Sequence, residues 1–315
     1  MRSWLRSRRR SLLAAPAVLS TEGLARAARL LVLRSRGEAT GLFAGNYASA
    51  FRGGGLEFDE SRPYVPGDDV RSIDWSATAR HGQTYVKRRR EERDQTLLFA
   101  LDTSASMGFG SHGASKASTA AHAIALLTSA ASRAGDRMGL VAFDTEVHTR
   151  IEPGRGADHG ARIIESAVGA ARRPGGGTDL RAGLRALRLQ TKRRSVVFLL
   201  SDLRGATSAE DLAWLARRHD VVAITLVDPL EYALPRVGPI RIADPEVGGV
   251  AVLDTSSRSS RRRYLAACAA RRQELASALV RVGAEPVWLR NDQHPLNALL
   301  RFFVSRGGRA RGWAA

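Results

Sequence analysis

The sequence predicts an α/β protein with a central, mostly parallel sheet covered by helices. Short apolar runs recur from Thr96 onward, and they alternate with longer segments whose apolar residues have helical spacing. Strands that alternate with helices favour right-handed crossover connections and hence a parallel sheet. Several runs, such as 96–101 and 196–200, are apolar on both faces, which is typical of strands buried between two helical layers.

The elements of this region follow from the same patterns. We expect strands at 96–101, 137–143, 196–200, 221–227 and 286–290, with an edge strand at 146–151. We expect helices at 114–134, 158–173, 180–191, 207–218, 261–282 and 296–304. Gly135 is expected to end the first helix, and Thr207 with Glu210 forms a capping box for the fourth. A β-hairpin insertion is expected at about 232–260, where turn residues separate two β-rich pieces.

The residues before the sheet region have a different character. Apolar residues at helical spacing predict a short amphipathic helix over 20–36. Residues 41–58 are Gly-rich and broken, so no single regular element is expected there. We therefore expect a basic tail and short helix (1–40), an extended, β-rich side module (41–94), the α/β domain (95–305) and a basic carboxyl-terminal tail (306–315).

Composition and charge limit the classes of partner. The chain has 315 residues, of which 44% are hydrophobic, and a formal net charge of +18. Its arginines cluster at 1–10 and 258–263, and such a positive field favours acidic partners. Aromatic residues make up only 6% of the sequence, and no recognition signature for nucleic acid is present. Specific nucleic-acid binding is therefore not expected, although the Arg-rich segments keep it as an alternative.

The sequence favours a cytoplasmic protein. Cys268 is the single cysteine, which excludes an internal disulfide and fits a reducing compartment. No apolar run approaches the roughly 18–20 residues that a transmembrane helix needs. Arg8, Arg9 and Arg10 precede a short apolar segment in the manner of an export signal, but Pro16 interrupts that segment. We interpret the first residues as a basic tail.

Polar side chains follow the expected strands at the points where they end. The first strand runs into Asp102, Ser104 and Ser106, Thr178 follows a triple glycine, and Asp202 follows the strand at 196–200. Ligands of open α/β sheets bind beyond the carboxyl ends of the strands. Two carboxylates and three hydroxyls suit a hard cation such as Mg²⁺ or Mn²⁺ and leave it open to one more carboxylate, from a partner. Taken singly, the same residues also suit helix caps or loop acids.

In these five positions the chain resembles the von Willebrand factor A fold, a Rossmann-like fold. The metal-ion-dependent adhesion site of that fold has the pattern Asp-x-Ser-x-Ser, then Thr, then Asp. The upstream segment resembles the signature of domain-of-unknown-function family 58, in which such a domain follows the signature. The residues that carry this second resemblance are Glu57, Arg62, Tyr64, Gly67, Asp68, Asp69, Arg71, Asp74, Trp75 and Arg80. The resemblance implies partnership with a MoxR-type AAA+ ATPase in chaperone-like assembly or maturation.

Our hypothesis is therefore a metal-dependent protein-binding adaptor rather than an enzyme. Phosphatase-like enzymes with a similar first strand need an acid two residues after the first Asp, where this chain has Ser104. Lys116 follows Ser115 rather than a glycine, so no ATP-binding phosphate loop is present. A metal-dependent hydrolase remains the first alternative, and a nucleic-acid binder the second.

Two further groups of residues are expected to be structural. Asp68, Asp69 and Asp74 are interleaved with Arg62, Arg71 and Arg80, which favours ion pairs over a catalytic cluster. The histidines have no metal-ligand spacing and are expected on the surface or in packing; they lie at positions 81, 112, 122, 148, 159, 219 and 294.

Overall fold

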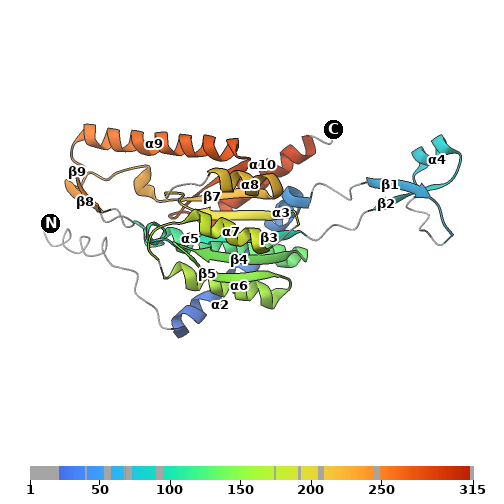
Figure 1. Ribbon diagram of the computed structural model, residues 1–315, viewed down its shortest axis with the longest axis horizontal. Helices are drawn as coiled ribbons and strands as arrows, with labels where there is room; N and C mark the ends of the chain where they lie inside the picture. The colour runs from blue at the N-terminus through green and yellow to red at the C-terminus, as the bar shows by residue number, and fades with distance from the viewer. Residues whose placement is uncertain are drawn as a thin grey trace. The chain divides into compact units, whose positions relative to one another are not determined.

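The computed structural model describes residues 21–39, 41–52, 58–66, 68, 73–89, 95–173, 175–190, 193–204, 209–243 and 249–312 (Figure 1). The chain divides into two compact units. The first comprises Met1–Ala44 with Gln95–Phe302, and the second comprises Gly45–Asp94 with Phe303–Ala315. We describe each unit by itself.

A six-stranded, mostly parallel sheet forms the centre of the first unit, as the sequence predicts. Its strands are β3 (Thr96–Asp102), β4 (Arg137–Phe143), β5 (Val147–Gly154), β6 (Val196–Ser201), β7 (Asp220–Val227) and β10 (Ala284–Arg290). Their order across the sheet is β10-β7-β6-β3-β4-β5. Only β5 runs antiparallel to its neighbour among these strands, which makes it the expected edge strand. The sheet therefore presents the carboxyl ends of β3 and β6 side by side.

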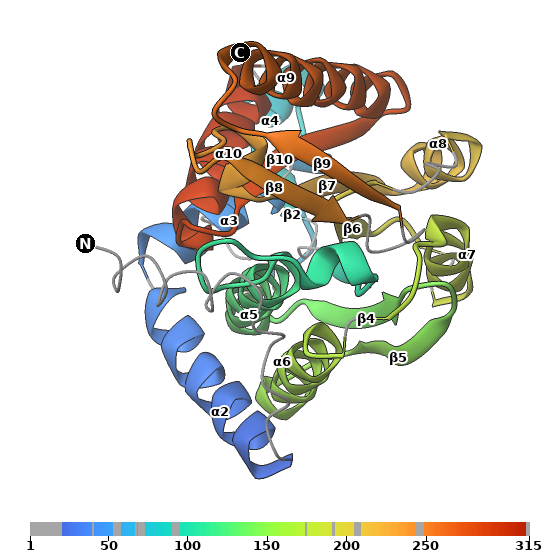
Figure 2. The ribbon, with the colours of Figure 1, turned by 90° about the vertical axis from the view of Figure 1, so that its left-hand side faces the viewer.

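Helices cover both faces of this sheet. They are α2 (Thr21–Glu38), α5 (Lys116–Ala134), α6 (Ala157–Ala171), α7 (Leu180–Gln190), α8 (Ala209–Arg218), α9 (Arg258–Arg281) and α10 (Pro295–Gly312). Figure 2 shows α5 and α6 on one side of the strands and α7 and α8 on the other. Leu98 and Ala100, two residues apart on β3, both pack in one core with Leu184 of α7 and Leu212 of α8, as expected for residues on the same face of a strand.

The predicted hairpin insertion is present. Strands β8 (Pro239–Ala243) and β9 (Val250–Asp254) pair antiparallel between β7 and α9. The turn residues 244–248 lie outside the described residues, as does Thr207 of the predicted capping box. Helix α9 begins at Arg258, three residues before its predicted start, because Ser257 caps it by accepting a hydrogen bond from the Ser260 amide.

The second unit contains a helix that the sequence analysis did not expect. Helix α3 spans Leu42–Arg52, within the segment interpreted as broken. Tyr47 and Phe51 lie four residues apart on one helical face, and each ring contacts Phe303 at 5.8 and 5.6 Å between centroids. Gly45 costs the helix about 1 kcal/mol relative to alanine, which the aromatic cluster outweighs.

The same aromatic cluster explains why the last helix is long. Helix α10 was expected to end at residue 304 and give way to a basic tail, but it continues to Gly312. Arg306 donates from Nε to the carbonyl of Ala50 and lies 4.7 Å above the Phe51 ring. An arginine counted as part of a solvated tail is thus a packing residue, because its planar cation stacks on an aromatic ring.

The signature segment of the second unit forms a small β-hairpin with a helical excursion. Strands β1 (Phe58–Pro63) and β2 (Tyr85–Arg89) pair antiparallel, and α4 (Trp75–His81) lies between them in sequence. Arg62 holds Asp68 through two hydrogen bonds of 2.8 and 2.6 Å. Figure 1 shows α4 beside this hairpin.

The other signature residues take different roles. Asp74 caps α4 by accepting from the amides of Ser76 and Ala77, and Arg80 donates to the carbonyl of Ser76. The Tyr64 amide donates to the Thr84 carbonyl, and Trp75 is 72% exposed. Glu57, Gly67, Asp69 and Arg71 lie outside the described residues.

None of the described helices combines the length and the apolar character that a bilayer crossing requires.

Candidate functional site

The carboxyl ends of two neighbouring strands assemble the candidate site. Strands β3 and β6 run parallel, with Leu101 level with Leu200, so Asp102 and Ser201 end up at the same edge. The hydroxyl of Ser201 donates to Asp102 Oδ2 at 2.5 Å and accepts from the amide of Leu203. Parallel pairing alone therefore brings two segments together that lie about a hundred residues apart in sequence.

Four oxygen-bearing side chains form one connected group, which we call the oxygen cluster: Asp102, Ser104, Ser106 and Asp202. The amide of Ser104 donates to Asp102 Oδ1 at 2.9 Å, and the hydroxyls of Ser104 and Ser106 are 3.3 Å apart. Ser106 donates to Asp202 Oδ1 at 3.2 Å. All four side chains are buried. The structure thus brings together four of the five predicted metal ligands.

The loop that carries the fifth predicted ligand adjoins the cluster. The amide of Ala105 donates to the carbonyl of Gly176 at 2.9 Å, and the amide of Gly175 donates to the carbonyl of Thr103 at 2.7 Å. A Cβ at Gly175 would stand 1.6 Å from Asp144 Oδ2, so only glycine permits this approach. Thr178 follows three residues after Gly175 and is half-buried. Its role as a metal ligand stays a prediction.

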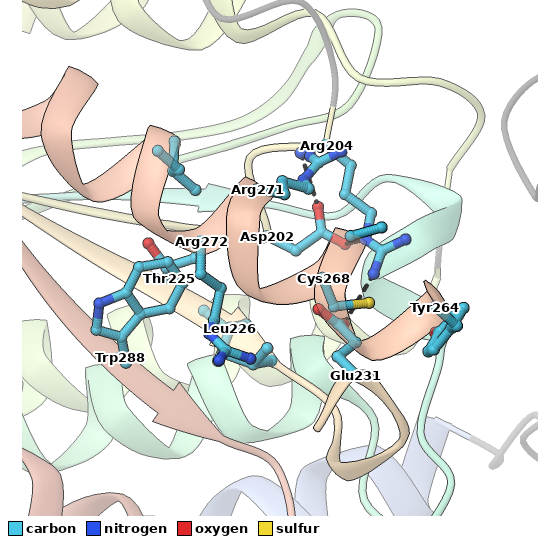
Figure 3. A pocket seen from close by; sticks show the side chains of 13 residues that line it. Asp202, Arg204, Thr225, Leu226, Glu231, Tyr264, Cys268, Arg271, Arg272 and Trp288 are labelled. Atoms are coloured by element: carbon cyan, nitrogen blue, oxygen red, sulfur yellow. Dashed lines mark hydrogen bonds and ion pairs between the residues drawn. The ribbon is translucent and has the colours of Figure 1, made fainter. Parts of the chain in front are cut away.

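A buried lysine completes the electrostatics of the site. Lys116, the first residue of α5, is 2% exposed, and its ammonium group pairs with Asp202 Oδ2. The same ammonium lies 3.8 Å from Glu231 Oε1. Arg204 reaches Glu231 Oε1 at 2.9 Å and Asp202 Oδ2 at 3.4 Å, as Figure 3 shows. Two carboxylates, Asp202 and Glu231, therefore face two cationic side chains at this edge of the sheet.

Sequence analysis did not select Lys116 or Glu231. The position of Lys116 could have indicated its role. A cation in the first turn of a helix opposes the helix dipole and is unfavourable there without a partner. A lysine placed there and followed by apolar residues at core spacing needs a buried carboxylate as partner. Glu231 gives no comparable signal, since it lies in a short 3-10 helix, Pro229–Glu231, after β7.

Burial changes the acid–base behaviour of Asp102. Desolvation raises its pKa to about 6, although hydrogen bonds from Ser201 and Ser104 act in the opposite direction and the nearby Asp202 carboxylate adds to the increase. The carboxyl group therefore exchanges its proton just below neutral pH. A cation that binds at neutral pH meets an ionised carboxylate at this position.

Asp228, at the end of β7, has the opposite behaviour. Although burial opposes its ionisation, hydrogen bonds from Ser111, Leu230 and Asn291 together lower the pKa of this carboxyl group. The Ser111 hydroxyl donates to Asp228 Oδ1 at 2.6 Å and the Asn291 amide to Oδ2 at 2.8 Å. Asp228 is thus a structural anion. It holds neighbouring loops together at the same edge of the sheet as the oxygen cluster.

A cavity of about 210 Å³ reaches the outer side of Asp202 beneath α9 (Figure 3). Arg204 and Glu231 line one wall, and Cys268 and Arg271 of α9 line another. The Arg271 guanidinium donates to the carbonyl of Leu203 at 3.0 Å, which fastens α9 to the loop after β6. Of the oxygen cluster, Asp202 alone lines this cavity, and the other three residues lie behind it.

The donor chemistry of the oxygen cluster fits a divalent cation that prefers oxygen. Its two carboxylates and two hydroxyls are all buried; hydrogen bonds link Ser104, Ser106 and Asp202 through their side chains, and the Ser104 amide links Asp102 to them. Hard cations such as Mg²⁺ and Mn²⁺ select such ligands over nitrogen or sulfur. The Lys116 ammonium supplies part of the positive charge that these carboxylates require.

Comparison with known proteins places this geometry in a family. The model of the family described as "Protein of unknown function DUF58" matches residues 60–274. The chain belongs to this family. An uncharacterized protein of Mycobacterium tuberculosis is 32% identical to this family member over 287 residues, which are 90% of each chain. The magnesium-chelatase 60 kDa subunit of Rhodobacter capsulatus is 31% identical over 136 residues, 41% of this chain and 22% of that protein.

Solved structures give weaker similarities. The conserved hypothetical protein BatB from Bacteroides thetaiotaomicron aligns with a TM-score of 0.42 at 15% identity, over 68% of this chain and 99% of that one. An aerotolerance-related membrane protein from Bacteroides fragilis aligns with a TM-score of 0.44 at 15% identity and the same coverage.

Proposed function

We propose that this DUF58 protein is a non-enzymatic, metal-dependent adaptor that binds other proteins through the oxygen cluster. Its first unit is a von Willebrand factor A-like domain in this proposal. Asp102, Ser104, Ser106 and Asp202, with Thr178, hold Mg²⁺ or Mn²⁺. The partner is a MoxR-type AAA+ ATPase, and the assembly serves chaperone-like maturation of other proteins.

The observation that carries the proposal is the link between the two strand ends. Ser106 follows β3 and Asp202 follows β6, and the 3.2 Å hydrogen bond between them joins two predicted ligand segments. When bound, a divalent ion supplies a positive centre that accepts a further carboxylate oxygen from a partner. The chain's own residues contribute the buried anions and hydroxyls that make this centre selective for oxygen.

The way the carboxylates are held favours binding over catalysis. Asp102 accepts from the Ser104 amide with one oxygen and from the Ser201 hydroxyl with the other. Asp202 accepts from Ser106 on one oxygen and pairs with Lys116 on the other. A nucleophile or general base needs an oxygen directed at its substrate, whereas the protein's own donors hold both oxygens of these carboxylates; a cation would share Asp202 with Lys116.

Two further observations support a role within an assembly. The Rhodobacter capsulatus relative is by its name one subunit of a chelatase, and it resembles 41% of this chain. The net charge of +18 favours encounter with an acidic protein face.

Affinity capture from native lysate tests this proposal. We expect an AAA+ ATPase to be retained by the wild-type protein with Mg²⁺, and to be lost with a chelator or with Asp102→Asn. Asp158→Asn is the matched control, because this carboxylate is exposed on α6. Equal recovery of the ATPase in all samples would exclude metal-dependent binding through the oxygen cluster. Turnover of phosphoesters that disappears in Asp102→Asn would favour the hydrolase alternative.

A further inference from the structure

Two histidines and a glutamate from separate helical segments meet on the first unit, away from the oxygen cluster. We call this group the histidine cluster: Glu38 at the end of α2, His122 in α5, and His294 directly before α10. One ligand atom from each residue lies within 4.8 Å of the other two. His122 Nε2 is 3.5 Å from Glu38 Oε2, and His294 Nε2 is 3.3 Å from Glu38 Oε1.

The two short distances run to different oxygens of the Glu38 carboxylate, which lies between the two imidazoles. With one atom taken from each residue, the three ligand atoms lie within 4.8 Å of one another, whereas ligand atoms about 2.1 Å from a tetrahedral zinc ion stand about 3.4 Å apart, so binding an ion would draw the three groups closer. The two imidazole rings are nearly perpendicular, with centroids 4.7 Å apart, so they converge without stacking. Two histidines and one carboxylate, with a position left for water, form a known ligand set of zinc proteins.

The cluster also contains buried polar atoms that form no hydrogen bond. Glu38 Oε2 and His122 Nε2 face each other at 3.5 Å, and neither has a hydrogen-bond partner in the described part of the chain. Leaving a buried polar atom unpaired costs roughly 1–3 kcal/mol, so such atoms call for an explanation. A cation between them satisfies both at once.

Access and protonation are compatible with metal binding. A cavity of about 400 Å³ is lined by His122, His294, Ser118 and Arg172, and it admits an ion with its water. Burial, His294 and Arg34 lower the pKa of His122, although Glu38 acts in the opposite direction. The neutral imidazole, which is the form that binds metals, is therefore favoured at neutral pH.

We propose that Glu38, His122 and His294 bind a Zn²⁺ ion. The ion ties the end of α2 to α5 and to the start of α10. Because borderline metals prefer nitrogen donors, this site selects Zn²⁺, whereas the oxygen cluster selects Mg²⁺ or Mn²⁺. The proposal does not depend on the function proposed for the oxygen cluster.

Zinc titration of the chelator-treated, full-length protein tests the inference. We expect calorimetry to detect one Zn²⁺ site in the wild-type protein, and saturating Zn²⁺ to raise its melting temperature by about 5 °C or more. Glu38→Gln keeps side-chain size and His294→Asn removes the Nε2 ligand atom, and each is expected to weaken binding at least about tenfold, as loss of a ligand does. His81→Ala is the control, because His81 is exposed and lies outside the cluster.

Two additional measurements separate this site from others. Asp102→Asn is expected to bind Zn²⁺ as the wild-type protein does, which assigns the binding to the histidine cluster. Co²⁺ in place of Zn²⁺ is expected to give the visible absorption of a four-coordinate site, and His294→Asn to abolish it. Absence of Zn²⁺ binding by the wild-type protein, or equal binding by His294→Asn, would overturn the proposal and leave the cluster an ordinary ion pair.

Discussion

The oxygen cluster and the histidine cluster differ in how the chain assembles them. The oxygen cluster takes Asp102 from the last residue of β3, Ser104 and Ser106 from the turn that follows, and Asp202 from the residue directly after the neighbouring strand β6. The histidine cluster takes single residues from α2, α5 and the segment before α10. The first arrangement leaves a contiguous motif in the sequence. The second exists only after the helices have packed.

The two clusters also differ in charge balance. The oxygen cluster carries its own counter-charges, because Lys116 and Arg204 pair with Asp202. The histidine cluster has buried atoms that lack any hydrogen-bond partner in the described residues. We infer that the oxygen cluster is nearly satisfied without a metal, and that a cation there competes with Lys116. The histidine cluster, in contrast, is completed by its cation.

Removing Lys116 gives the strongest test of whether the oxygen cluster carries its own counter-charge. Lys116→Met leaves Asp202 without its buried ammonium, and loss of one partner of a buried ion pair typically costs about 3–5 kcal/mol. We expect urea unfolding of the metal-free variant to show a loss of this size, and Mg²⁺ to restore more stability to the variant than to the wild-type protein. Equal effects of Mg²⁺ on both proteins would show that Lys116 and the cation do not share Asp202.

The pH dependence of stability is expected to distinguish Asp102 from the other carboxylates. Its pKa is about 6 in the folded protein and near 3.8 when unperturbed, so the folded state binds more protons than the unfolded chain between these values. The free energy of unfolding should therefore fall by at most about 3 kcal/mol as pH rises from about 4 to about 6.

Asp102→Asn should lack this fall. The measurement is urea unfolding of both metal-free proteins across this pH range, and the difference between them isolates Asp102 from other titrating groups. An identical pH profile for the variant and the wild-type protein would contradict the raised pKa.

The second cation of the oxygen cluster should contribute less than the first. Arg204 contacts both Glu231 and Asp202, but its side chain is 42% exposed. Solvent screens such a pair, so we expect Arg204→Met to cost about 1 kcal/mol or less in urea unfolding. A loss as large as that of Lys116→Met would show that burial does not separate the two cations.

Substitution of Trp75, a residue of the family signature, is expected to change the free energy of unfolding least. Trp75 is 72% exposed at the start of α4. Exposed substitutions usually change the free energy of unfolding by no more than about 0.5 kcal/mol, and we expect this of Trp75→Ala. A clear drop in melting temperature would mean that the indole ring is buried in the folded protein.

Sequence patterns predicted the sheet well because its strands have a strong local signal. The apolar runs at β3 and β6 end within two residues of their predicted ends, and the mostly parallel arrangement follows from the alternation with helices. The oxygen cluster was predicted for the same reason, since parallel neighbours end at one edge. Helix α3 was missed because Gly45 and the glycines that follow obscured its aromatic face.

Features that depend on distant packing left no such signal. Lys116 was considered only for the absence of a phosphate loop, and its buried pairing with Asp202 needs the carboxyl end of β6 beside the start of α5. His122 and His294 were expected on the surface or in packing, because their sequence separation has no metal-ligand spacing. Their contact arises from the position of His294 at the start of α10.

Calorimetric titration of Mg²⁺ into the chelator-treated protein tests the central claim most directly. We expect one Mg²⁺ site in the wild-type protein, loss of this site in Asp102→Asn, and its retention in His294→Asn. That result would assign Mg²⁺ to the oxygen cluster and separate it from the histidine cluster. Undiminished Mg²⁺ binding by Asp102→Asn would contradict the account.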